Sequence, residues 1–435
     1  MNAQTAQSVE TEKPAGLKEL LRNRNYRFLW LGQIVSDFGD SLTMLALLIL
    51  VNQITGSAAA IATMFIVLLV PHVTVGLVAG VYVDRLDRKR IMVVSDIVRG
   101  VLVLGFVGVA LLGTADYLWL MYVLGFLQAM VGTLFTPARS ALIPNIVPQQ
   151  ALLSANSISQ ASRVIFGLLG TASAGLLIGL SNEMWVPFVI DSLTFFASAL
   201  LIWRIKTPRH VAEPGAKGDM RAVFGQLGDG MKIIAQSRTL VGTLVGMAVT
   251  MLGLGAVNVL MVPLIINDMK LPATWFGLIE LVQTAAMVLS GGLVAVLAAR
   301  LKPTSIVSGA LSMLGLVIGS IALANNLIVL GIIIFGAGLL ITPIQAGVAT
   351  IMQTSVDNKM RGRVGSALNS VISISQLVSM GVAGTLAEVV GVRNVFLAGG
   401  VLTLLAGLAF AAIMKAPSKS NAVAPSGEIP AGSLG

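Results

Sequence analysis

Two aspartates lie in the middle of an apolar stretch. Asp37 and Asp40 belong to FLWLGQIVSDFGDSLTMLALLIL, residues 28–50, which has the length of a membrane-spanning helix. A charged side chain at the centre of such a helix costs about 3 kcal/mol. Residues three apart on a helix differ by about 60° in direction and about 4.5 Å in height. Both carboxylates therefore share one face, and we expect that face to look into a central cavity.

Two carboxylates this close together in a poorly hydrated site do not both ionise readily. We therefore expect one of them, Asp37 rather than Asp40, to hold a proton that a cationic substrate displaces. The alternative for Asp40 is a hydrogen bond to a neighbouring helix. Gln33, one turn before Asp37, belongs to the same candidate site for substrate and protons.

Four further polar residues in apolar stretches are candidates for this site. His72 follows Pro71, which indicates a helix kink. The histidine either packs against neighbouring helices or takes part in binding substrate or protons. Arg163 either binds an anionic group or neutralises a carboxylate from the first or third span. Glu280 and Gln283 lie at helical spacing in FGLIELVQTAA, and Glu280 is a candidate for lining the cavity. A histidine, a cation, a carboxylate and an amide can bind polar groups of a substrate or carry protons.

Two more acidic residues in apolar stretches suggest structural roles. Asp96 and Arg99 are three apart, so they share a helix face and are expected to pair with each other. Asp191, in FVIDSLTFF, is expected to be a buried hydrogen-bonding residue.

Composition excludes several classes of protein. Apolar residues make up 56% of the 435 positions, charged residues 11%, and the mean hydropathy is +0.91; soluble domains carry about 25% charged residues. The chain has no cysteine and two histidines, and it lacks the phosphate-binding loop of nucleotide hydrolases. We expect a membrane protein without enzymatic activity, cofactor or bound nucleic acid.

Twelve apolar stretches are long enough to cross a bilayer, which predicts an all-α membrane protein. If both termini are cytoplasmic, every Lys and Arg lies on that side except Arg99 and Arg163, in spans, and Lys270 and Arg393, outside. This asymmetry is typical of a multi-pass protein of the inner membrane. The expected spans are 28–51, 58–83, 91–113, 117–137, 156–180, 184–204, 239–266, 273–299, 304–323, 326–350, 364–389 and 392–414.

A polar segment divides the spans into two sets of six. Residues 205–237 predict a cytoplasmic linker, with a surface helix over 220–234. We expect an N-terminal half over 1–204, a C-terminal half over 238–415 and a disordered tail over 416–435, which is rich in Ser, Pro, Gly and Ala.

The two halves repeat each other in sequence. Gly32 and Gly39 recur 214 positions later as Gly246 and Gly253, and the dipeptide at 136–137, Thr-Pro, recurs at 342–343. Matches in the same order at nearly constant spacing indicate a parallel duplication, with the halves related by an axis along the membrane normal. A binding site between the halves follows from this arrangement.

The segment GVYVDRLDRKR, residues 80–90, resembles the G-x-x-x-D-R-x-x-R-K-R signature of the major facilitator superfamily. GQIVSDFGD, FTPARSALIPNIVP and RGRVGSALNS resemble the branch of that family with macrolide-efflux and enterobactin-export proteins. The resemblance implies the twelve-helix fold and four gating residues on the cytoplasmic side: Gly80, Asp84, Arg85 and Arg88. Gly80 lets neighbouring helices approach, and Asp84 holds the cytoplasmic mouth shut.

The sequence departs from the family pattern at several positions. Asp87 stands where the first signature usually has Gly, and the second half has Ala299 where Asp84 would recur. The basic residue that many drug antiporters carry in the fourth span is Gly125, and the Gly-Pro pair usual in the fifth is absent from GTASAG. These departures weaken the inference of proton antiport and leave the fold untouched.

The resemblance implies a secondary active transporter, a monomer in the lipid bilayer, that exports an amphipathic or drug-like small molecule by alternating access. Proton antiport is the expected coupling. A lysophospholipid, siderophore or nutrient carrier, or a ferroportin-like metal transporter, is the alternative. We expect a largely apolar cavity whose walls are Trp30, Phe38, Met44, Met247 and Met251, because methionine packs around varied shapes.

Overall fold

The computed structural model describes residues 17–76, 86–113, 115–181, 183–207, 220–357 and 360–415. Every regular element in these ranges is helical. Eleven helices are long and apolar enough to cross a membrane, and a twelfth, α3 (Ala58–Thr74), is apolar but has 17 residues within the described part. The all-α prediction with twelve spans is confirmed.

The first helix group holds six of these helices and follows the short helix α1 (Leu17–Arg22). Caps define its first long helix: the Asn23 side chain accepts hydrogen bonds from the first backbone N–H groups, and Gly56 ends the helix with a φ of 63°, which glycine adopts without steric cost. The members are α2 (Arg24–Thr55), α3, α5 (Arg88–Leu112), α6 (Leu118–Ile146), α7 (Leu152–Ser181) and α8 (Val186–Trp203).

The second helix group contains the other six spans. Its first helix continues into a π-helical turn, residues 263–268, that begins with Pro263. The members are α10 (Arg238–Val262), α11 (Trp275–Ala298), α12 (Pro303–Ser320), α13 (Leu327–Ser355), α14 (Arg361–Val390) and α15 (Val392–Lys415).

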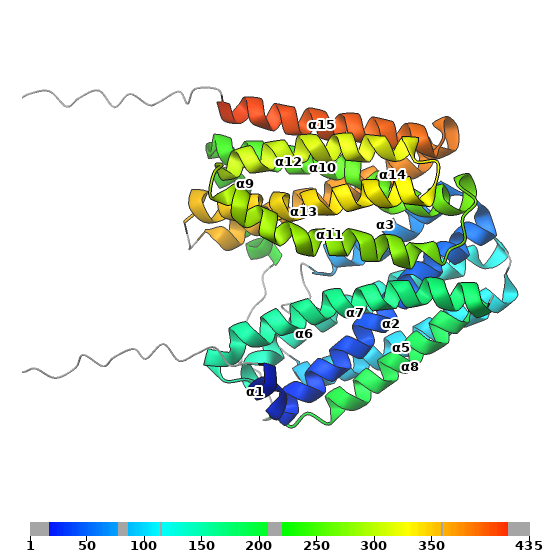
Figure 1. Ribbon diagram of the computed structural model, residues 1–435. Helices are drawn as coiled ribbons and strands as arrows, with labels where there is room; N and C mark the ends of the chain where they lie inside the picture. The colour runs from blue at the N-terminus through cyan, green and yellow to red at the C-terminus, as the bar shows by residue number, and fades with distance from the viewer. Residues whose placement is uncertain are drawn as a thin grey trace, which may run out of the picture.

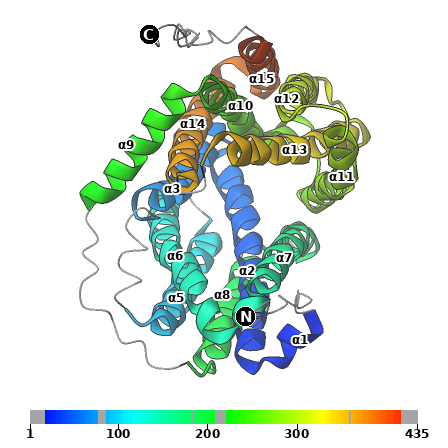
Figure 2. The ribbon, with the colours of Figure 1, turned by 90° about the vertical axis from the view of Figure 1, so that its left-hand side faces the viewer.

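The expected surface helix is α9 (Met220–Gln236), which precedes the second group. It packs along α14, where Asp229 and Arg363 form an ion pair at 3.2 Å and Gly230 lies against the Arg363 backbone (Figure 2). Residues 208–219 of the expected linker and the expected tail over 416–435 lie outside the described residues.

The glycines that repeat in sequence occupy matching positions in space. A Cβ on Gly39 would lie 2.1 Å from Thr194 Oγ1, where α2 crosses α8. A Cβ on Gly253 would lie 2.0 Å from Thr403 Oγ1, where α10 crosses α15. Both contacts are far closer than a methyl group tolerates, so each glycine permits the first and last helix of its group to touch.

The two helix groups converge at one end and diverge at the other (Figure 1). The described chain begins in α1 and ends in α15 at the diverging end, which we call the termini end (Figure 1). The opposite end, where the groups meet, is the far end. Between the groups, α3 packs on α14 and α7 packs on α11.

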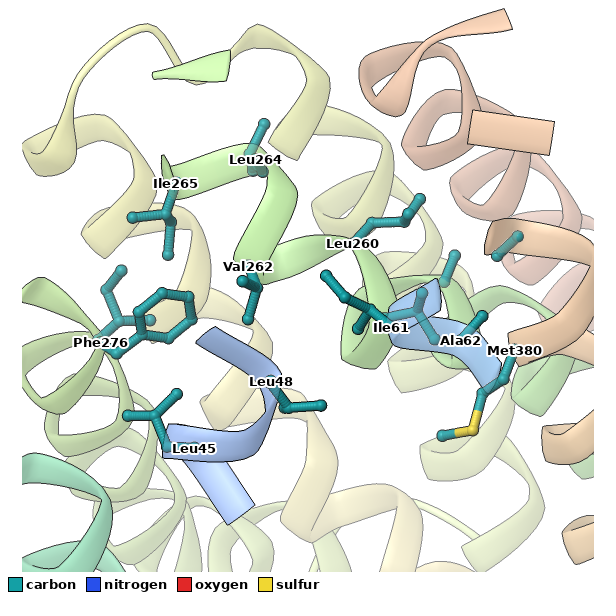
Figure 3. Close-up of a cluster of buried hydrophobic side chains, with 14 of the residues drawn as sticks. Leu45, Leu48, Ile61, Ala62, Leu260, Val262, Leu264, Ile265, Phe276 and Met380 are labelled. Atoms are coloured by element: carbon teal, nitrogen blue, oxygen red, sulfur yellow. The ribbon is translucent and has the colours of Figure 1, made fainter. Parts of the chain in front are cut away.

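Small residues bring the groups together near the far end. A Cβ on Gly384 of α14 would lie 2.4 Å from Ala62 Cβ of α3, and one on Gly277 of α11 would lie 2.4 Å from Ala172 Cα of α7. Figure 3 shows the buried apolar cluster to which both groups contribute. Its labelled members come from α2 (Leu45, Leu48), α3 (Ile61, Ala62), α10 and the turn after it (Leu260, Val262, Leu264, Ile265), α11 (Phe276) and α14 (Met380).

Polar contacts between the groups also lie at the far end. The side-chain amides of Asn52 and Asn267 donate to each other's oxygens at 2.9 Å. Glu388, near the end of α14, accepts hydrogen bonds from Ser57 Oγ and, at 3.3 Å, from the Ala59 backbone N–H. The carboxylate therefore sits at the N-terminus of α3, where the helix dipole favours negative charge. Among the described residues, no other hydrogen bond and no ion pair joins the groups.

One predicted boundary is wrong. We expected the fourth span to end at 137, but α6 continues through Pro137 and Pro144 to Ile146. Its counterpart α13 likewise continues through Pro343 to Ser355. Proline removes one helical hydrogen bond, and neighbouring helices support the backbone of spanning helices against that loss. Arg139 is therefore a helix residue and not part of a cytoplasmic loop.

Candidate functional site

A cavity of about 550 Å³ lies between the helix groups. Its walls come from α2, α3, α5 and α6 of the first group and from α10 and α14 of the second. The polar side chains in the walls include Asp40, His72, Arg99, Gln128, Asn258 and Gln376. The apolar ones include Met44, Leu47, Phe65, Leu68, Leu69 and Met380. A mainly apolar pocket with a few polar groups is typical of small-molecule sites.

Asp40 faces this cavity, as expected, and forms an ion pair with Arg99 of α5. The Arg99 guanidinium lies 4.2 Å from the centre of the Phe195 ring, so the aromatic face also stabilises the cation. The Arg99 side chain is 12% exposed and the Asp40 side chain 37% exposed. The arginine is thus held inside the protein, while the carboxylate remains accessible from the cavity.

Asp37 forms a second, looser pair with Arg163 of α7. Arg163 Nε and Asp37 Oδ1 are 3.8 Å apart, and no hydrogen bond joins them. The Asp37 side chain is 22% exposed. Of the two roles considered for Arg163, the structure places it beside a carboxylate of the first span. The two aspartates on one face of α2 therefore have different arginine partners at different distances.

Arg139 is a polar residue of this region that the sequence reading missed. With the Gln33 amide oxygen facing the guanidinium, Gln33 accepts hydrogen bonds from Arg139 Nε and Nη1 at 3.1 Å each. Gln33 is buried, at 4% exposure. The available signal was the continuation of the apolar pattern beyond Pro137, in ARSALIPNI. Arg139 thus adds a third arginine, beside Arg99 and Arg163, to the interior of the first helix group.

The expected pairing of Asp96 with Arg99 is wrong, since Arg99 pairs with Asp40. Asp96 instead accepts a hydrogen bond from Ser198 Oγ at 2.6 Å, which links α5 to α8. Asp191 accepts one from Thr194 Oγ1 at 3.1 Å, in line with the expected hydrogen-bonding role. Both carboxyl groups are fully buried, and one oxygen of each has no hydrogen-bond partner among the described residues.

Of the seven candidates for the substrate and proton site, Asp40 and His72 line the cavity. The other five do not, and they are Gln33, Asp37, Arg163, Glu280 and Gln283. His72 Nδ1 lies 3.0 Å from the Leu68 carbonyl oxygen, one turn earlier in α3, and the ring is exposed to the cavity. Glu280 and Gln283, on α11, are half-buried and do not line it. Their assignment to the substrate site stays a prediction.

Of the four gating candidates, Gly80, Asp84 and Arg85 lie outside the described residues. Arg88 Nη1 donates to the Ala141 carbonyl oxygen at 3.0 Å, within the first helix group. It ties the start of α5 to the end of α6. A gating role for all four residues stays a prediction.

The apolar wall differs from the expected one. Met44 lines the cavity, but Trp30, Phe38 and the two methionines of α10 do not. Trp30 turns toward α7 and donates its indole N–H to Ser162 Oγ at 2.9 Å. Phe65 and three leucines take these places. Side-chain direction around a helix depends on its packing partners, which the sequence alone did not supply.

No group of three or more His, Cys, Asp or Glu side chains within the described ranges is placed to hold a metal ion.

Comparison with known proteins identifies the family of the chain. The sequence profile of the Major Facilitator Superfamily matches residues 29–379 and 243–434. Macrolide efflux protein A of Streptococcus pyogenes is 25% identical over 392 residues, covering 86% of this chain and 92% of that protein. Multidrug efflux pump Tap of Mycobacterium tuberculosis is 28% identical over 403 residues, covering 89% and 93%.

A solved structure has the same fold. The crystal structure of a bacterial homologue of the iron transporter ferroportin, in an inward-facing state, superposes with a TM-score of 0.73. It is 15% identical, and the match covers 91% of this chain and all of that one. The profile match, the similar transporters and the arrangement of twelve helices around a central cavity lead to one conclusion: the chain belongs to the Major Facilitator Superfamily of membrane transporters.

Proposed function

We propose that this transporter exports an amphipathic small molecule by alternating access. The observation that carries the proposal is the cavity between the helix groups, which combines a polar side at Asp40, Arg99 and His72 with walls of leucine, phenylalanine and methionine. Such a surface suits a molecule with one cationic or hydrogen-bonding group on an apolar body. The efflux proteins named among the similar sequences support export as the direction.

Proton coupling is the second part of the proposal. A cationic substrate beside Asp40 in the cavity would lie about one helical turn from Asp37, which is outside the cavity wall, and its charge would favour the ionised form of both carboxylates. A proton on Asp37 gives up a weak contact with Arg163 at 3.8 Å, whereas a proton on Asp40 breaks a hydrogen-bonded pair with Arg99. The geometry therefore supports Asp37 as the residue that exchanges the proton.

The conformation supports alternating access between the predicted halves, 1–204 and 238–415. The far end is closed by packed small residues and a few hydrogen bonds, while the groups diverge at the termini end (Figure 1). We propose that the termini end is cytoplasmic, in the inner membrane. The cycle then requires the far-end contacts to break so that the cavity opens outward.

A test of this function is drug susceptibility in an efflux-deficient host that expresses the chain. We expect expression to raise the inhibitory concentration of lipophilic cations and macrolides, and a protonophore to remove that protection, because the exchange is driven by the proton gradient. Protection that survives the protonophore would contradict proton coupling. Accumulation of the tested compound in place of its loss would contradict export.

Glu388→Ala should loosen the closure of the far end. The change removes the acceptor for Ser57 and for the Ala59 N–H, and each lost hydrogen bond is worth about 0.5–1.5 kcal/mol. The loss of both bonds, about 1–3 kcal/mol together, changes the ratio of closed to open states by a factor of about 5 to 150. Distances between spin labels on Gln53→Cys and Val389→Cys report it, and the chain has no cysteine of its own.

Glu183→Ala is the matched control for this experiment. Glu183 is an exposed far-end carboxylate that accepts a hydrogen bond from Trp185, in the same helix group, at 2.9 Å. Its replacement should leave the label distances unchanged. Identical distance distributions for Glu388→Ala and the parent chain would show that Glu388 does not stabilise the closed far end.

A further inference from the structure

A second hollow, of about 440 Å³, lies at the termini end, where the start of α5 meets the end of α8. It shares no residue with the central cavity and is built entirely from the first helix group. Two cations, Lys89 and Arg90, lie in its walls with Asp87, and Val93, Val94 and Trp203 supply apolar surface. The hollow therefore combines charged groups with an exposed aromatic ring.

The chain beyond α8 is fixed in place around this hollow. Lys89 Nζ donates to the Ile205 carbonyl oxygen at 2.7 Å. Asn25, at the start of α2, accepts from the Lys206 N–H at 3.0 Å and donates to the Lys206 carbonyl oxygen at 2.8 Å. These bonds hold residues 205 and 206 against α5 and α2, between the wall residues Trp203 and Thr207.

The charged groups in the walls favour an anion. Lys89 uses one of its three ammonium donors on Ile205, and the Arg90 guanidinium has no hydrogen bond or ion pair with any described residue. Asp87 is engaged in capping α5, because its carboxylate accepts from the Arg90 backbone N–H at 3.0 Å. Two cations face one carboxylate, and the N-terminus of α5 adds partial positive charge.

An apolar strip leads away from the hollow toward the far end. On α5, Val94 is 57% exposed, and Val101 and Leu104 continue the exposed surface. On α8, which packs beside α5, Trp203 is 64% exposed and Leu200 follows one turn earlier. Exposed apolar side chains on a spanning helix are suited to contact the hydrocarbon of a bilayer, and tryptophan is typical of the level at which headgroups begin.

We propose that this hollow binds an anionic phospholipid of the leaflet at the termini end, with its phosphate at Arg90 and Lys89 and an acyl chain along the strip between α5 and α8. A free phosphate lacks the apolar part that this strip accommodates. Basic pockets beside spanning helices bind anionic headgroups by the same combination of charge and depth.

The test uses the full-length chain, purified in detergent and stripped of lipid, with native mass spectrometry to count bound lipid during titration. Phosphatidylglycerol should bind in preference to phosphatidylcholine. Arg90→Gln should weaken phosphatidylglycerol binding about fivefold, the factor that corresponds to about 1 kcal/mol for one basic residue near a membrane surface. Arg90→Lys, which keeps the charge, should retain most of the affinity.

Arg300→Gln is the matched control, since Arg300 is an exposed arginine just after α11 at the same end of the other helix group. It should bind lipid as the parent chain does. Trp203→Ala, which removes an exposed side chain, should also weaken binding if the acyl chain lies on the strip. Equal binding by Arg90→Gln and the parent, or displacement of the lipid by glycerol phosphate, would overturn the proposal.

Discussion

Asp37→Asn should abolish both proton release on substrate binding and export driven by a proton gradient, while the protein still folds. Asparagine keeps the size of the side chain but cannot exchange a proton. The pair that it breaks, with Arg163 at 3.8 Å, is not hydrogen-bonded and both side chains are partly exposed, so little folding free energy is lost. The effect falls on coupling because the variant removes the carboxyl group proposed to carry the exchanged proton, about one helical turn from Asp40 in the cavity wall.

Two measurements check this result. Purified protein in weakly buffered detergent should release protons when a lipophilic cation is added, and Asp37→Asn should release none. Asp116→Asn is the control, since Asp116 is exposed in the short turn before α6, and it should release protons normally. An Asp37→Asn protein that exports at the normal rate, with a normal dependence on the gradient, would refute the coupling role.

Asp40→Asn should destabilise the protein much more than Asp37→Asn does. Arg99 is 12% exposed and would lose its carboxylate partner. Removing one partner of a buried pair costs about 3–5 kcal/mol, and we expect the lower end because the Asp40 side chain is 37% exposed. The midpoint of thermal unfolding in detergent measures the loss.

The double variant Asp40→Asn with Arg99→Gln measures how much of the stability comes from the interaction between the two side chains. It leaves no unpaired charge between α2 and α5. The free energy of unfolding should therefore fall by less in the double variant than the sum of its losses in the two single variants. Arg163→Gln is the matched control for an arginine in a loose pair and should lower the midpoint less than Arg99→Gln. Additive losses in the double variant would show that Asp40 and Arg99 are not coupled.

The fold could be predicted from the sequence because the length of an apolar stretch is enough to identify a spanning helix. The repeated glycines also predicted the duplication, since Gly39 and Gly253 make equivalent contacts in the two helix groups. The boundary at Pro137 failed for a physical reason. Proline ends helices in water, but a spanning helix supported by its neighbours continues through it, so α6 runs to Ile146.

The candidate site was predictable only in part. The shared face of Asp37 and Asp40 was predicted from helical spacing, but of the two carboxylates Asp40 lines the cavity and Asp37 does not. Their partners did not follow, because spacing along one helix says nothing about which neighbouring helix approaches. Arg99 turns away from Asp96, on its own helix, and pairs with Asp40 across the gap between α5 and α2.

The far-end closure has a consequence for turnover. Within the described part of the chain, its polar bonds are the Asn52–Asn267 pair and the Glu388 contacts with Ser57 and Ala59, and none is an ion pair between two charged side chains. Hydrogen bonds of this kind contribute about 1 kcal/mol each. Breaking the polar part of the closure therefore costs only a few kcal/mol, which is within the range that a difference in ligand or ion affinity between the two conformations can offset.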